Sequence, residues 1–150
     1  EGKIYLYDWT QVDSLGARFE NMVAVHLLKM VHFYNDTGQA ELELKYLRTK
    51  DQFEVDFIVL SDRKPLFTVE VKLSDTHLDP TFKKFQKFLN VPHFQIIKEG
   101  NYFRTYKQDN GLMAYVISFS SFLLNCLKDH LQLYFYVRRS RADVKINVFN

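Results

Sequence analysis

The chain has little cysteine, proline or glycine, and it has no long apolar run. With one cysteine, Cys126, among 150 residues, no disulfide can form within the chain, and a reducing compartment such as the cytoplasm is expected. Only three prolines and five glycines occur, and no internal repeat or low-complexity tract is present. No apolar run approaches the roughly 20 residues that a membrane-spanning helix needs, so no membrane association is expected.

An excess of one charge and an ATP-binding motif are also lacking. The formal net charge is +2, which is too small to indicate nucleic-acid binding by itself. No Walker A pattern occurs. The opening residues do not resemble a signal peptide and lead at once into a strand-like run, so we expect a fragment of a longer protein.

The composition is that of one folded domain with an aromatic-rich core. Hydrophobic residues make up 47% of the chain and aromatic residues 16%, including 14 Phe and 9 Tyr. The residue patterns predict, in order, a short strand, a helix, three strands, a helix and a further strand, then a less distinct strand and helix; the ranges are 3–8, 13–33, 42–48, 53–60, 66–72, 79–89, 94–97, 113–117 and 119–129. Because a helix separates strands 66–72 and 94–97, these two strands are expected to be parallel. The predicted fold is therefore an α/β domain, with a mixed central sheet flanked by helices.

Charged residues occur where two of these strands should be buried. Glu70 and Lys72 share one face of strand 66–72, while Val69 and Val71 share the other. Asp56 lies in a strand that is otherwise apolar from Val55 onward. A strand that enters a crossover is commonly buried on both faces, and buried charges are paired or bind a metal.

A third carboxylate, Glu20, lies at the edge of the apolar stripe of the first helix and is expected to face the protein. Carboxylate oxygens are what Mg²⁺ or Mn²⁺ prefers. The predicted metal ligands are thus Glu20, Asp56 and Glu70, and Lys72 is expected to orient or deprotonate an attacking water.

Asp56 followed by Glu70-Val71-Lys72 resembles the D…(D/E)-x-K signature of restriction-endonuclease-like (PD-(D/E)XK) nucleases, and Glu20 resembles their preceding helix glutamate. The order of elements is similar to the αβββαβ core of that fold. Around these residues, the segments 16–21, 54–57 and 69–74 look like the C-terminal domain of prokaryotic AAA-type ATPases, a domain mostly catalogued as of unknown function. The resemblance covers about residues 3–100. It implies a catalytic site of Glu20, Asp56, Glu70 and Lys72, a Mg²⁺ or Mn²⁺ cofactor, DNA as substrate, and an ATPase domain elsewhere in the same protein.

We assign residues 1–125 to this nuclease-like domain and leave 126–150 as a C-terminal extension without a predicted fold. Two functions stay open: hydrolysis of a DNA phosphodiester, and a non-catalytic module that keeps the nuclease fold to bind DNA or a partner.

Each candidate residue also has a simpler interpretation. Glu70 and Lys72 could be an exposed pair, Glu20 a surface salt bridge, and Gln86 a solvated glutamine rather than a substrate contact. The histidines show no zinc spacing, and His26 is expected to pack in the core. Several basic residues could form a phosphate-binding surface, although solvated charge is the default; they are Lys83, Lys84, Lys87, Arg138, Arg139 and Arg141.

Overall fold

A computed structural model of the protein describes residues 4–48, 54–86, 88–98, 100–108 and 111–128. Helix α1 (Leu15–Asp36) precedes the meander of β1 (Leu42–Arg48), β2 (Glu54–Ser61) and β3 (Lys64–Lys72). Then follow α2 (Thr81–Gln86), β4 (His93–Ile97), β5 (Phe103–Lys107), β6 (Met113–Ser118) and α3 (Phe119–Lys128). A short 3-10 helix, η1 (Trp9–Gln11), lies before α1.

The described strands form one mixed six-stranded sheet in the order β1-β2-β3-β4-β6-β5. Strand β3 pairs with β4 in parallel, as expected for a crossover through α2, and β4 pairs with β6 in parallel. The other pairs are antiparallel. The predicted α/β fold with a mixed sheet flanked by helices is therefore confirmed.

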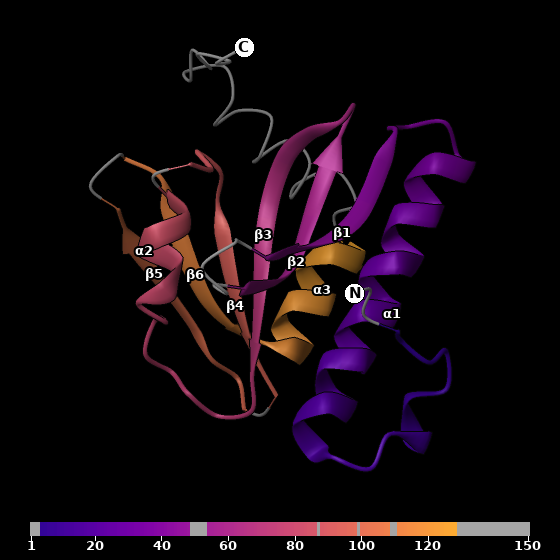
Figure 1. Ribbon diagram of the computed structural model, residues 1–150, viewed down its shortest axis with the longest axis horizontal. Coiled ribbons are helices and arrows are strands. Elements are labelled where there is room, and N and C mark those ends of the chain that lie inside the picture. The colour runs from indigo at the N-terminus through magenta and orange to yellow at the C-terminus, as the bar shows by residue number, and fades with distance from the viewer. Residues whose placement is uncertain (1–3, 49–53, 87, 99, 109–110, 129–150) are drawn as a thin grey trace.

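Helices α1 and α3 cover one face of the sheet, and α2 lies on the other (Figure 1). The main core lies under α1 and α3. It joins apolar side chains of both helices to alternate residues of the central strands, which include Phe57, Val59, Phe67, Val69, Phe94 and Ile96. On the opposite face, the buried Phe82 of α2 stacks on His93 of β4 at 4.1 Å between ring centroids. Strand β3 is interior and covered from both sides, as its crossover position requires.

Helix α1 begins after a capping residue, Ser14. The Ser14 side chain accepts a hydrogen bond from the Ala17 backbone N–H at 3.5 Å, and the helix ends before Gly38, whose φ is +67°. Buried residues at helical spacing, such as Val23, Leu27 and Val31, face the sheet. The strands β2 and β3 are joined by a tight turn in which Asp62 and Arg63 have φ of 49° and 62°, which matches the twist of a hairpin.

Three expectations need correction. Residues 4–8 form no strand, because the Asn21 side chain accepts from the Leu6 N–H and donates to its carbonyl, so α1 satisfies this backbone. The helix expected over 79–89 covers only Thr81–Gln86; Phe82 and Phe85 are buried, whereas Phe88, beyond the helix, is 81% exposed. Strand β5 was not predicted, since its residues are mostly exposed and show no apolar alternation.

Strands β5 and β6 pair antiparallel on either side of Gly111. The boundary placed at residue 125 falls within α3, and residues 129–150 lie outside the described residues. No helix among the described residues is long and apolar enough to cross a membrane.

Candidate functional site

Strand β3 places Glu70 and Lys72 on the face that α2 covers. Val69 and Val71 point the other way and pack into the main core. The side chains of Glu70 and Lys72 are only 16% and 31% exposed, and Lys72 Nζ lies 2.9 Å from Glu70 Oε1. The pair is therefore half-buried in the interior of the sheet, not an exposed surface pair.

Asp56 lies beside this pair on the neighbouring strand. Phe57 pairs with Val69, and strand alternation then puts Asp56 and Glu70 on the same face. Asp56 Oδ2 accepts a hydrogen bond from the Val71 backbone N–H at 2.8 Å, and the Asp56 backbone N–H interacts with the Glu70 carboxylate. Three of the predicted site residues, Asp56, Glu70 and Lys72, are thus brought together.

Glu20 lies in a different layer of the fold. It belongs to α1, which covers the opposite face, and its Oε1 accepts a hydrogen bond from the Tyr5 hydroxyl at 2.8 Å. Within the part of the chain that the structure describes, no three His, Cys, Asp or Glu side chains form a group that could hold a metal ion. The structure therefore does not gather Glu20, Asp56 and Glu70 into one ligand set.

A further carboxylate, Asp79, enters the site from the segment before α2. Its Oδ2 lies 2.8 Å from Lys72 Nζ, and its Oδ1 accepts from the Thr81 backbone N–H at 2.8 Å. Asp79 is not among the site residues predicted from the sequence. A capping carboxylate has a second oxygen, and here that oxygen pairs with the lysine.

Gln95 of β4 was also not predicted from the sequence as a residue of the site. Its side chain is fully buried and makes three hydrogen bonds, each of 2.8 Å, to the segment between β3 and α2. It donates to the carbonyls of Asp75 and His77 and accepts from the Asp79 N–H. The signal was a polar residue within the apolar run 94–97, an anomaly of the same kind as Glu70.

His93 forms the buried floor of the site. Its Nδ1 lies 2.8 Å from Thr68 Oγ1, and its Nε2 has no hydrogen-bond partner among the described residues. A cavity of about 10 Å³, bordered by His93, Glu54, Glu70 and Asp79 among others, lies beside it. That volume is about the size that admits one water molecule.

The charges of the site act on one another. Burial raises the pKa of Glu70, and the adjacent Lys72 offsets only part of this effect. Burial opposes the charge of Lys72, but hydrogen bonds to Asp79 and Glu70 outweigh it and raise the lysine pKa. Burial likewise opposes the charge of Asp79, yet the contacts with Lys72 and Thr81 lower its pKa to about 2. Lys72 is therefore a cation and Asp79 an anion at neutral pH.

The remaining candidates lie around or outside this cluster. Lys83 and Lys84 are exposed on α2. His26 packs between aromatic rings, edge-on to Phe119 at 5.3 Å and beside Trp9, as expected for a structural histidine. The side chains of Gln86 and Cys126, and all of Lys87, His130, Arg138, Arg139 and Arg141, lie outside the described residues.

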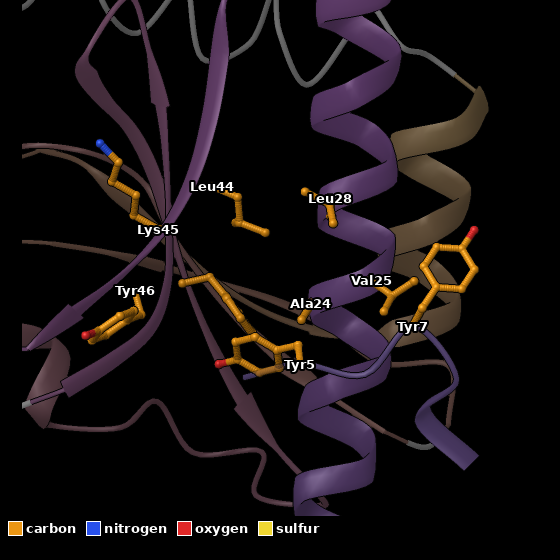
Figure 2. Close-up of a pocket in the computed structure, with 9 residues that line it drawn as sticks. Tyr5, Tyr7, Ala24, Val25, Leu28, Leu44, Lys45 and Tyr46 are labelled. Atoms are coloured by element: carbon orange, nitrogen blue, oxygen red, sulfur yellow. The ribbon is translucent and has the colours of Figure 1, made fainter. Parts of the chain in front are cut away.

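A larger cavity of about 300 Å³ lies between α1, β1 and the N-terminal segment (Figure 2). Its walls are mostly apolar and include Tyr5, Tyr7, Leu28, Leu44 and Phe57. Tyr5 connects this cavity to Glu20 through its hydroxyl. Asp56, Glu70, Lys72 and Asp79 are not among its lining residues.

A family model matches most of the fold described above. The model of the family described as Domain of unknown function (DUF4143) matches residues 15–122, from the start of α1 into α3. No curated protein matches the chain. The match includes Glu20, Asp56, Glu70, Lys72, Asp79 and Gln95, and it covers well over half of the 150 residues. The chain therefore belongs to the DUF4143 family of domains of unknown function.

Proposed function

We propose that this domain is a nuclease-like module that hydrolyses a DNA phosphodiester with the help of a divalent cation. The observation that carries the proposal is the half-buried cluster of Asp56, Glu70 and Lys72 on one face of the interior strands. A sheet interior seldom holds two carboxylates and an ammonium without a task, because burying charge is costly. The association of this domain with an AAA-type ATPase domain remains a prediction of the resemblance.

The donor set fits a small divalent cation. Asp56 and Glu70 supply hard carboxylate oxygens from adjacent strands, which suits Mg²⁺ or Mn²⁺. Burial raises the pKa of Glu70 by more than Lys72 lowers it, so a cation beside this carboxylate would favour its charged form. When bound, the cation would make a water more nucleophilic and stabilise negative charge on a phosphate. Glu20 remains a third ligand only as the resemblance predicts it, since it lies on α1 and accepts a hydrogen bond from Tyr5.

Lys72 carries the positive charge with which a residue can orient a water or a phosphate oxygen. Its raised pKa keeps the ammonium protonated at neutral pH, so of the two roles predicted from sequence, orienting a water or a phosphate oxygen is favoured over deprotonation. Lys83 and Lys84 are exposed on α2, and their positive charge supports a polyanionic substrate.

A second function is favoured by a specific contact. Lys72 already pairs with both Glu70 and Asp79, which is how a purely structural ion-pair network would look. The module would then bind DNA or a protein partner without cleaving it.

Titration with Mg²⁺ and Mn²⁺ by calorimetry, followed by a nicking assay on supercoiled plasmid, distinguishes the nuclease from the non-cleaving binding module. The matched variants are Glu70→Gln and Glu43→Gln, since Glu43 pairs with Lys45 on β1 at the same spacing but at the sheet edge. We expect Glu70→Gln to lose cation binding and cleavage and Glu43→Gln to keep both. If the unaltered protein binds no divalent cation and cleaves no plasmid, the nuclease proposal is wrong.

A further inference from the structure

Lys72 is held between two carboxylates that belong to different parts of the chain. Glu70 lies two residues before it on β3, at 2.9 Å, and Asp79 lies in the segment leading to α2, at 2.8 Å. Glu70 belongs to the proposed cation site, whereas the side chain of Asp79 also caps the start of α2. The two carboxylates therefore hold the ammonium from opposite ends of the β3–α2 connection.

The place of Asp79 is determined by several independent contacts. Its Oδ1 accepts from the Thr81 N–H, and its own backbone N–H donates to Gln95 Oε1. Its carbonyl accepts from the Phe82 N–H at 3.2 Å. With backbone and side chain both held, Asp79 Oδ2 stays near Lys72 at little further cost in conformational entropy.

Gln95 keeps the whole connecting segment in this position. Its amide group donates to the carbonyls of Asp75 and His77 while its oxygen accepts from Asp79, so one buried side chain fixes three points of the segment. Gln95 is next to Glu70 in the parallel register of β3 and β4. The anchor of the segment and the proposed cation ligand therefore share one rigid part of the sheet.

We propose that Asp79 is a positioning residue that retains the Lys72 ammonium when Glu70 engages a divalent cation. The inference rests on the proposed function of the site. Glu70 Oε1 faces the ammonium in the structure described, so a cation that draws on this carboxylate competes with Lys72. Asp79 gives the ammonium a second partner, and Lys72 can stay beside the cation without leaving the site. Without Asp79, Lys72 would turn fully to Glu70 and compete with the cation.

The test compares Asp79→Asn with Asp75→Asn. Asn still caps a helix, so Asp79→Asn removes the charge and keeps the local fold; Asp79→Ser serves the same purpose. Asp75 lies on the same segment, but its side chain contacts the exposed His77 and not Lys72. We expect Asp79→Asn to weaken Mn²⁺ binding roughly three- to tenfold in calorimetry, and Asp75→Asn to leave it unchanged. Equal affinities of Asp79→Asn and the unaltered protein would overturn the proposal.

A double-mutant cycle distinguishes positioning from a general effect of negative charge. If Asp79 acts through Lys72, Asp79→Asn should change Mn²⁺ affinity little in a Lys72→Met background. A full effect in that background would show that Asp79 attracts the cation directly, and the positioning role would be wrong.

The metal-free protein supplies a readout that does not depend on the proposed function. In ¹⁵N-detected NMR, the Lys72 ammonium resonance should have the same chemical shift in the unaltered protein and in Asp75→Asn, and should move in Asp79→Asn, because the ammonium then keeps Glu70 alone of its two carboxylate partners. A protein that binds no cation but shows this pattern refutes the nuclease function and keeps the Lys72 contact. A Lys72 resonance that Asp79→Asn leaves unmoved refutes the positioning role whatever the cation does.

Discussion

The sheet carries the same Glu-x-Lys pattern twice, and the two copies share their local contacts but differ in burial. Glu43 and Lys45 flank Leu44 on β1, and Glu70 and Lys72 flank Val71 on β3. Leu44 and Val71 both pack against the main core, and both ion pairs are short, at 2.7 and 2.9 Å. A local sequence motif and a local contact are therefore equal in the two places.

Position in the sheet separates them. Strand β1 is the edge of the described sheet, and the side chains of Glu43 and Lys45 are 36% and 55% exposed. Strand β3 is interior, and the exposed fraction of the Glu70 side chain is less than half that of Glu43. Lys72 also has a further partner, Asp79. The comparison teaches that burial, and not the motif, turns an ordinary ion pair into a candidate site.

The largest difference is expected on removing each lysine. Lys72→Met leaves Glu70 and Asp79 close together and partly buried, so the free energy of unfolding should fall by about 1–3 kcal/mol. Lys45→Met should change it by less than about 1 kcal/mol, because exposed pairs contribute little. Urea unfolding of both variants measures the two values, and equal losses would remove the distinction between edge and interior.

Acid should affect the interior region in particular, because it contains His93. Burial lowers the pKa of His93 to about 3, whereas in the unfolded chain it returns to about 6.5. The unfolded state thus binds a proton first, and stability is complete above pH 6.5 and is lost as pH falls from 6.5 to 3. The slope should reach about 1.4 kcal/mol per pH unit.

The variant His93→Gln isolates this contribution, since it keeps a polar side chain for Thr68 and removes the titrating group. Its unfolding free energy, measured by urea titration between pH 7 and 4, should depend less on pH than that of the unaltered protein. His77→Gln is the control, because His77 is exposed and should leave the slope as it was. An unchanged slope in His93→Gln would show that another group is responsible.

Replacing a carboxylate of the site should have a smaller effect on stability. Burial raises the pKa of Glu70, so its charge is disfavoured in the folded protein, and Glu70→Gln should leave stability unchanged or raise it by about 0–2 kcal/mol. Asp56→Asn should behave similarly, although its carboxylate also accepts from the Val71 N–H. Thermal melts with and without Mg²⁺ measure the stability of each variant and any stabilisation by the cation. Unfolding of the metal-free Asp56→Asn variant, with no Mg²⁺ shift in the unaltered protein, would favour a structural network.

Salt should produce the smallest difference. The coupling of Glu43 with Lys45, measured by a double-mutant cycle, should be about 0.2–1 kcal/mol and should shrink as NaCl is raised from low to high concentration. The coupling of Glu70 with Lys72 should be less sensitive, because protein covers more of it. Equal salt dependence of the two couplings would place both pairs in similar solvent.

Much of the framework could be predicted from local patterns. The periodicity of α1, the meander and the parallel crossover each follow from apolar spacing and turn residues, and each is present. Strand β5 could not be found in this way, because exposed residues need no alternation and its pairing with β6 alone makes it a strand. Residues 4–8 were misassigned for the converse reason: a strand-like run was satisfied by the Asn21 amide instead of by a partner strand.

By itself, the sequence determined that Glu70 and Lys72 share one face of a strand, since alternation is a property of the extended backbone and needs no knowledge of neighbours. It also determined that Asp56 would interrupt an apolar strand. Only the tertiary structure decided that β3 is interior while β1 is an edge, that Glu20 belongs to the opposite layer, and that Asp79 and Gln95 complete the cluster. These facts depend on contacts between segments far apart in the chain, whose approach is governed by the burial of the whole apolar surface and leaves no local periodicity to detect.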